Sequence, residues 1–411
     1  MADDNHSRAS GWIARSDAHY RRGVKLFDQG RNGEALNEFE QALELHPQSP
    51  QALNGRAVVA QRAGRWQESL ADLNEAIRLD SNYAKAYVNR ATALVEVDKS
   101  ELAIQDLNTA VDLDPGFALA HGNRAGFYFN KGEWEKSIAD VTNAIECEPE
   151  NAGWYVVRAS ALAQRAKFDS ALADLDKAIR LDPSDGTTYG LRGQVLLELK
   201  EFGRAILDLS QTIRLGRDSH EVYHDRAIAR LSFGQPEDAV SDFNEAIRRD
   251  PNCEITYAHR ALAHVASGDP GRALVDLTES TRREPQSAKT FKARAQAWTA
   301  LGRHQQVIAD CDRAIELVPD DPEPYSLRGN AWEELGEESR ASADFASALQ
   351  HASADPESLS SRAHDRSQLG DHDKPGDDVS MRNIPEKPLP QTAVMSIVAA
   401  VGILIYFCFF R

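Results

Sequence analysis

The sequence predicts an all-α chain built from tandem helical hairpins, and three observations support this prediction. The 411 residues repeat with a period of 34 from residue 16 to residue 355, without an insertion. Every repeat places small and large apolar residues at helical spacing, and most repeats carry glycine and proline at the ends of the helical halves. Self-similarity at a fixed period of this size is typical of stacked-repeat architectures.

Three columns of the repeat predict the inner face of each hairpin. The first column is small in all ten repeats: Gly23, Ala57, Ala91, Ala125, Ala159, Gly193, Ala227, Ala261, Ala295 and Gly329. The second is apolar throughout: Phe39, Leu73, Leu107, Val141, Leu175, Leu209, Phe243, Leu277, Cys311 and Phe345. Three residues after each of these stands a small residue, as at Ala42 and Ala178. This i, i+3 spacing predicts one buried stripe along a helix.

Glycine and proline separate the two helices of each repeat. Seven repeats have glycine between the halves, at a position that suits the left-handed residue ending a helix. Seven have proline after the second half, because proline cannot continue a helix but is well tolerated just before or at the start of the next one. The departures are Asp98, Ala166 and Lys200 in place of glycine, and Ser81, Arg217 and Ser353 in place of proline.

Segments such as ALADLDKAIRLDP (171–183) and ESLADLNEAIRLD (68–80) resemble the tetratricopeptide repeat. The resemblance covers ten units: 16–49, 50–83, 84–117, 118–151, 152–185, 186–219, 220–253, 254–287, 288–321 and 322–355. It implies a right-handed solenoid whose first helices line a concave groove. In that family the groove holds extended peptides or partner helices.

The flanks of the array carry different predictions. Residues 1–15 are expected to be disordered, and 356–370 to form a capping helix, because they repeat the start of the tenth unit without a second helix. Residues 371–391 read as an acidic linker with four prolines and no apolar periodicity.

A hydrophobic segment follows the linker. Residues 392–410 contain no charge and are rich in Val, Ile, Leu and Phe. As a helix they would span roughly 28 Å, close to the ~30 Å hydrocarbon core of a bilayer. They predict a transmembrane helix acting as a tail anchor. Lys374, Arg382 and Lys387 precede the segment, and only Arg411 follows it, so the positive-inside rule predicts repeats on the cytoplasmic side.

The composition indicates which classes of binding partner to expect. Acidic residues outnumber basic ones 64 to 47, which gives a net charge of −17 and disfavours nucleic-acid binding. The four cysteines lie far apart, without metal-site or disulfide-framework spacing. We therefore expect protein or extended-peptide partners, no cofactor, and no small-molecule substrate.

Two charged columns run unbroken through the repeats. The arginines of the first helices are Arg22, Arg56, Arg90, Arg124, Arg158, Arg192, Arg226, Arg260, Arg294 and Arg328. The acids of the second helices are Glu38, Asp72, Asp106, Asp140, Asp174, Asp208, Asp242, Asp276, Asp310 and Asp344. A row of anion-binding arginines is one interpretation. A structural ladder of ion pairs is favoured, because ligand positions should vary between repeats and these do not. The partner of Arg158 could be Asp174 or Asp140.

The first-helix positions that vary between repeats are the candidates for the partner groove. The middle repeats place glycine at some of these positions, which costs helix stability by about 1 kcal/mol each relative to alanine. Such glycines would let something approach the backbone closely. The expected groove residues are Leu119, Gly122, Gly126, Phe129, Val156, Ser160, Gly190 and Gln194.

One catalytic pattern occurs, the HExxH at 220–224. His220 and His224 would share a helix face as a zinc pair does, with Glu221 as the base. However, the stretch lies in register with the other nine first helices, and no further ligand motif follows it. We expect a membrane-anchored scaffold without catalytic or metal residues. The alternatives are a zinc hydrolase using 220–224, a fortuitous metal site that includes His259, and an exported surface protein.

Overall fold

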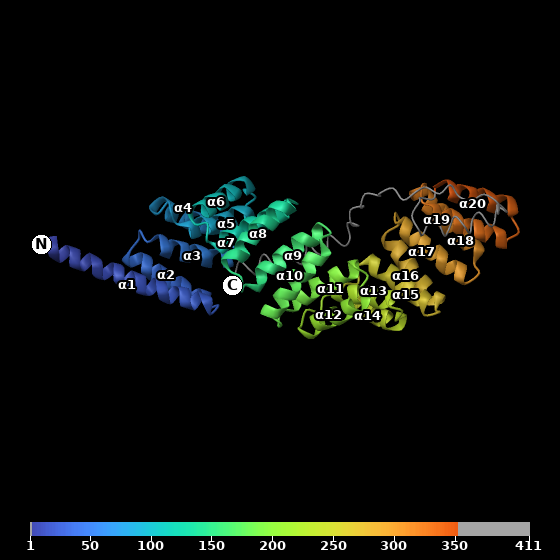
Figure 1. Ribbon diagram of the computed structural model, residues 1–411, viewed down its shortest axis with the longest axis horizontal. Coiled ribbons are helices and arrows are strands. Elements are labelled where there is room, and N and C mark those ends of the chain that lie inside the picture. Colours follow the sequence, from blue (N-terminus) through green and yellow to red (C-terminus); the bar gives the residue numbers. More distant parts are fainter. Residues whose placement is uncertain (1, 352–411) are drawn as a thin grey trace. The chain divides into compact units, whose positions relative to one another are not determined.

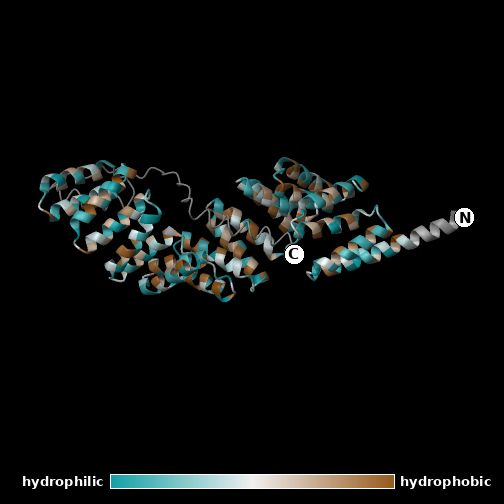
Figure 2. Cartoon of the chain, turned by 180° about the vertical axis from the view of Figure 1, so that it is seen from behind, coloured by the Kyte–Doolittle hydropathy of each residue, from teal (hydrophilic) through white to brown (hydrophobic). Residues whose placement is uncertain are grey.

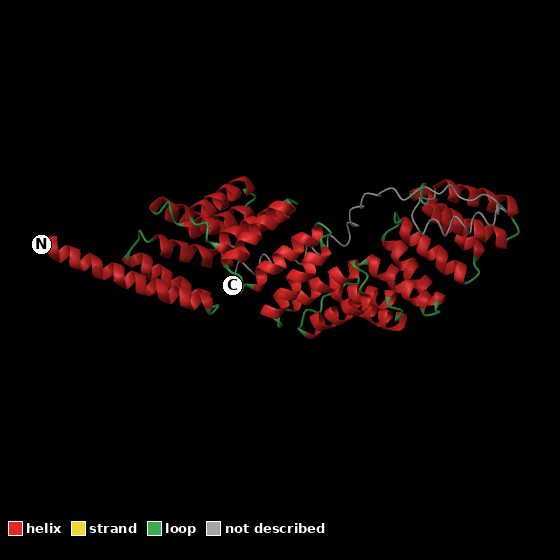
Figure 3. Cartoon of the chain, viewed as in Figure 1, coloured by secondary structure: helices red, strands yellow, loops and turns green. Residues whose placement is uncertain are grey.

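The computed structural model describes residues 2–351, and all of the secondary structure there is helical. Figure 1 shows helices joined by short turns, and Figure 3 shows no strand among these residues. The first helices of the ten repeats are α1 (Ala2–Asp28), α3 (Pro50–Arg62), α5 (Ala84–Glu96), α7 (Ala118–Asn130), α9 (Ala152–Gln164), α11 (Gly186–Glu198), α13 (His220–Ser232), α15 (Glu254–Ala266), α17 (Ala288–Ala300) and α19 (Pro322–Glu334).

Each first helix is followed by a second helix after a short turn. The second helices are α2 (Asn32–Leu45), α4 (Trp66–Leu79), α6 (Ser100–Leu113), α8 (Trp134–Cys147), α10 (Phe168–Leu181), α12 (Phe202–Arg214), α14 (Pro236–Arg249), α16 (Pro270–Arg283), α18 (His304–Leu317) and α20 (Glu338–His351). The all-α class predicted from the 34-residue period is confirmed.

The chain divides into two compact units, one reaching to Leu191 and the other beginning at Arg192. Within each unit a helix contacts the helices next to it in sequence, and successive first helices also touch one another. This nearest-neighbour packing is the property that defines a repeat array.

The N-terminus differs from its prediction. Residues 1–15 were expected to be disordered, yet α1 begins at Ala2 and continues through Ser16 without a break. Trp12 and Ile13 are exposed, so tertiary packing does not explain the extension. Extending a helix that is already nucleated by the first repeat costs far less than starting one, which accounts for the longer helix.

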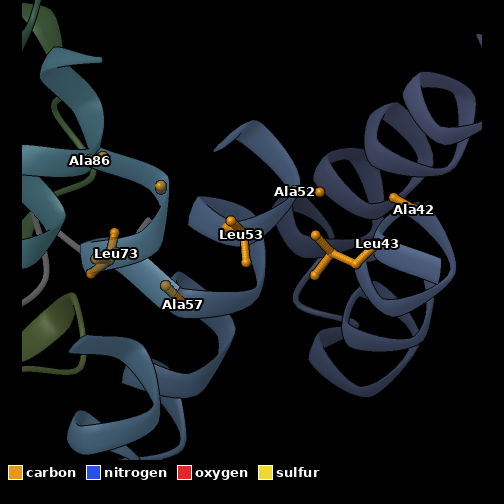
Figure 4. Packing of buried hydrophobic residues seen from close by; sticks show 8 residues of the cluster. Ala42, Leu43, Ala52, Leu53, Ala57, Leu73 and Ala86 are labelled. Carbon is orange, nitrogen blue, oxygen red and sulfur yellow. The ribbon is translucent and has the colours of Figure 1, made fainter. Parts of the chain in front are cut away.

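The core of each unit lies between facing stripes of large and small residues. Figure 2 shows brown and teal residues alternating along the helices, as expected for amphipathic segments with one buried side. In Figure 4, Leu43 lies between the ribbons close to Ala42 and Ala52, and Leu73 lies further along, toward Ala57 and Ala86. All of these side chains are buried. The alanines let the helices approach closely, and the leucines fill the remaining space.

In two repeats a glycine of the small column makes room for a phenylalanine of the large column. A Cβ atom added to Gly23 would lie 2.6 Å from the Phe39 ring, and one added to Gly329 would lie 2.7 Å from the Phe345 ring. In both repeats the phenylalanine takes up the volume that an alanine methyl would need. The glycines of this column are therefore explained by packing between the two helices of one hairpin.

The turn between the halves has the same backbone in every repeat. Seven glycines there have positive φ, between 65° at Gly302 and 84° at Gly234. The three substitutes adopt the same left-handed conformation, with φ of 59° at Asp98, 53° at Ala166 and 59° at Lys200. The turn geometry therefore comes from the helix packing, and these three residues carry its strain.

No helix among the described residues is long and apolar enough to cross a bilayer. The capping helix (356–370), the linker (371–391) and the transmembrane helix (392–410) predicted above all lie outside the described residues.

Candidate functional site

The ladder arginines reach the acids sixteen residues later in their own repeats. In nine repeats the guanidinium donates from both Nε and Nη2 to the two carboxylate oxygens, as at Arg158 and Asp174, where both distances are 2.8 Å. In the first repeat Arg22 makes only one such bond to Glu38, at 3.0 Å, and His19 shares the carboxylate. For Arg158 the structure selects Asp174 over Asp140.

A third hydrogen bond ties several of these arginines to the preceding repeat. Nη1 of Arg90 donates to Asn74 at 2.9 Å, and Nη1 of Arg124 donates to Asn108 at 3.0 Å. Each of these arginines thus joins a first helix to two second helices. Most of the partner aspartates are buried, so the ladder contributes to the packed interior and does not present free cations to a ligand.

Five of the eight groove residues expected from sequence are buried within the array. A Cβ at Gly122 would lie 2.3 Å from the ring of Trp154, so this glycine makes room for a neighbouring side chain. Phe129 is buried and its ring lies 4.8 Å from that of Trp134. Gly126, Val156 and Ser160 are also buried.

The remaining three groove residues, Leu119, Gly190 and Gln194, are half-buried. Gln194 donates to the Asp225 carboxylate at 2.9 Å. The sequence alone could not reveal that the group approaching the backbone at Gly122 is the Trp154 side chain of the next repeat.

The two histidines of the HExxH stretch do not converge on one point. Both ring nitrogens of His224 are engaged: Nδ1 lies 3.0 Å from the Thr256 hydroxyl, and Nε2 lies 3.1 Å from Nδ1 of His259. His220 instead has Nδ1 3.2 Å from the Glu221 carboxylate. His224 therefore lacks a free nitrogen for a metal shared with His220, and the zincin geometry is not formed.

Burial shifts the proton affinities of this helix face. Desolvation, with a smaller repulsion from His259, lowers the pKa of His224 to about 3. Desolvation likewise lowers the pKa of His259 to about 4. Desolvation raises the pKa of Asp225 to about 6, although its bond from Gln194 acts in the opposite direction. The two histidines are therefore neutral at pH 7, and one must donate to the other.

An exposed surface does occur on the first helices of the second unit. On α15, Ile255 and Leu262 are 38% and 37% exposed, and their spacing of seven places them on one face. Their equivalents are Glu221 and Ile228 on α13, and Lys289 and Gln296 on α17. α15 contacts both of these helices, and of the four equivalents Glu221, Lys289 and Gln296 are exposed while Ile228 is half-buried. We call these six residues the α15 face. They occupy the same two repeat columns as Leu119 and Gly126, but in repeats for which no groove residue was expected from the sequence.

Comparison with known families identifies the architecture. Family models described as tetratricopeptide repeat match residues 15–84, 88–152, 156–220 and 259–322, and a further one matches 220–253. The chain belongs to the tetratricopeptide repeat family. This confirms the resemblance inferred from the repeat columns.

Several solved structures are similar at low identity. Yeast Tom70 is 14% identical, covering 86% of this chain and 96% of its own, with a TM-score of 0.42. A protein from Parabacteroides merdae is 18% identical, covering 60% and 98%, with a TM-score of 0.46. YrrB, described as having an unusual peptide-binding site, is 23% identical, covering 45% and 95%, with a TM-score of 0.41. No curated protein sequence matches the chain.

Proposed function

We propose that this tetratricopeptide repeat protein is a scaffold that binds a protein partner through the α15 face. The observation that carries the proposal is the pair of exposed aliphatic side chains, Ile255 and Leu262, on a first helix. Exposed aliphatic residues that share one face are a feature of interaction sites. The family to which the chain belongs supports the choice of the first-helix side.

The chemistry around the pair indicates the kind of partner. Glu221 lies on one neighbouring helix and Lys289 on the other, so charges of opposite sign flank the apolar centre. The Lys292 ammonium on α17 is held by Asp321 and Glu323 at 2.8 and 2.7 Å, and so is less free to pair with a ligand. An extended or helical segment with apolar residues at its centre and charges at its rim fits this arrangement.

Site-specific photo-cross-linking in cells tests this binding surface. A photoreactive residue at Leu262 should capture a partner, whereas one at Val275 in the same repeat should not. Val275 is the matched control because it is 70% exposed on the second helix α16. Leu262→Asp should abolish capture by a probe placed at Ile255. Equal capture from Leu262 and Val275, or capture unaffected by Leu262→Asp, would exclude the α15 face as the binding surface.

We further propose that residues 392–410 anchor the scaffold in a membrane with its repeats on the cytoplasmic side. The support is the uncharged segment of near-bilayer length and the basic residues that precede it. A chain truncated after Pro390 should move from the membrane pellet to the soluble fraction and still cross-link through Leu262. A truncated chain that stays in the pellet after an alkaline wash would rule out residues 392–410 as the anchor. Digestion of the repeats by protease added to intact cells would show that the repeats lie on the outer side of the membrane.

A further inference from the structure

A histidine, an aspartate and a cysteine meet where repeats 7 and 8 join. Ligand atoms of His220, Asp250 and Cys253 all lie within 4.8 Å of one another. His220 begins α13, Asp250 follows the end of α14, and Cys253 immediately precedes α15. Within residues 2–351 this is the one such group of three. All three are half-buried, so the group is packed but still reachable from solvent.

The repeat fold does not require two of these residues. At the position of His220 eight of the other nine repeats carry Ala, Gly, Ser or Pro, the remaining one carries Glu254, and none carries histidine. Cys253 occupies a helix N-cap position but makes no capping hydrogen bond. At the same position Ser49, Asn151 and Asp321 do cap their helices. Tyr83, Phe117 and Ser219 at this position likewise make no cap, so the repeat tolerates many residues here and does not require a cysteine.

Neighbouring groups orient each of the three side chains. The Glu221 carboxylate holds Nδ1 of His220 at 3.2 Å, which leaves Nε2 as the nitrogen available for a metal. The backbone N–H of Asn252 donates to one oxygen of Asp250 at 2.9 Å. The Thr256 hydroxyl donates to Sγ of Cys253 at 3.2 Å, and His224 contacts that hydroxyl from its other side. Such outer contacts are characteristic of built metal sites, where they fix the ligands and tune them.

We propose that His220, Asp250 and Cys253 bind a zinc ion. An imidazole nitrogen, a thiolate sulfur and a carboxylate oxygen are all ligands that zinc accepts. Three protein ligands leave one tetrahedral position for water or a group from a partner. Because the ligands come from the ends of three helices, the ion cross-links α13 to the α14–α15 turn. Of the HExxH stretch, His220 is a ligand, Glu221 orients it, and His224 supports Thr256.

Cobalt titration of the untagged full-length protein in detergent provides the test. We expect one equivalent of Co²⁺ to bind and to give a thiolate-to-cobalt absorption band and tetrahedral d–d bands. Zinc should displace the cobalt, since zinc binds such ligand sets more tightly. Cys253→Ser should lose the thiolate band, and His220→Ala should weaken binding at least tenfold. Thr256→Val should weaken it about tenfold through loss of the contact to Sγ.

The variants are chosen so that the repeat still folds. Alanine stands at the His220 position in Ala84, Ala118, Ala152 and Ala288, and serine stands at the Cys253 position in Ser49 and Ser287. Circular dichroism should show unchanged helix content. Cys147→Ser, which removes an exposed cysteine elsewhere, should keep the band. Absence of saturable cobalt binding, a band that survives Cys253→Ser, or full affinity in His220→Ala would each overturn the proposal.

Discussion

At the scale of single residues, the left-handed turn position shows where the sequence is not optimal. Ala166 has φ of 53°, a conformation that costs an L-residue roughly 1–2 kcal/mol and a glycine little. We expect Ala166→Gly to raise the free energy of unfolding by about 0.5–1 kcal/mol, after the larger chain entropy of glycine is subtracted. Urea unfolding would measure the change. As a control, Ala71→Gly at an exposed position inside α4 should instead lower the free energy of unfolding by about 1 kcal/mol.

Also at the residue scale, His224 and Asp225 should make stability depend on pH in opposite directions. The folded pKa of His224 is about 3, so between pH 6.5 and 3 the unfolded chain binds the extra proton and stability falls as pH falls. The folded pKa of Asp225 is about 6, so between pH 6 and 3.8 the folded chain binds the extra proton and stability rises as pH falls.

Chelator-treated variants separate these two contributions. His224→Asn should flatten the loss of stability on acidification below pH 6.5. Asp225→Asn should stabilise the chain at pH 7, where the buried carboxylate is ionised, while the amide oxygen still accepts from Gln194. Urea unfolding at pH 7.5, 6 and 5 measures both. Identical pH slopes in His224→Asn and the unchanged protein would contradict the assignment of the acid effect to this histidine.

At the scale of the helix pair, the match between Gly329 and Phe345 predicts a compensating double change. Gly329→Ala places a methyl 2.7 Å from the ring, so overpacking should outweigh the gain in helix propensity and cost about 1–2 kcal/mol. Phe345→Leu in the same chain should recover most of the loss, because Ala57 with Leu73 and Ala159 with Leu175 already occur in other repeats. Denaturant unfolding of the four chains tests this, and additive losses would contradict it.

The ladder makes a second prediction at this scale. Arg158→Ala leaves Asp174 buried without its two charge-assisted bonds and should cost on the order of 3 kcal/mol. Replacing both Arg158 and Asp174 by apolar residues of similar size should cost less than the single change. The double-mutant cycle measures the coupling. A double variant less stable than the sum of the two single losses would show that the pair does not act as a unit.

The helix pairs could be predicted from the sequence because each column recurs ten times. This recurrence gave the 34-residue period, the small and large apolar columns, and the position of the turn between the two helices. The partners of the variable positions were not predictable. Gly122 was expected to admit a ligand, but Trp154 of the next repeat fills the space, and sequence spacing within one repeat carries no information about that approach. His224 likewise meets His259 across a repeat boundary, which no motif within one helix can show. The two charged columns of the ladder were visible in the sequence, but the choice of Asp174 over Asp140 as the partner of Arg158 needed the structure.

At the scale of the whole molecule, the helices of residues 2–351 contact chiefly their neighbours in sequence and successive first helices. A chain lacking residues 84–117 should therefore fold into a shorter array. The deletion brings Asn74 to the place of Asn108, so that Arg124 keeps an asparagine partner at the same position. Helix content per residue by circular dichroism should stay unchanged, and unfolding in urea should remain cooperative with a modestly lower midpoint.

A smaller deletion provides the contrast. Removing only residues 100–117 takes out α6 and its following turn, so two first helices would follow one another and Arg90 would lose Asp106. This chain loses fewer residues but breaks the alternation of helices, and it should unfold at a much lower urea concentration than the chain lacking a whole repeat. If the half-repeat deletion proved as stable as the full-repeat deletion, stability would not depend on the 34-residue hairpin as the unit of packing.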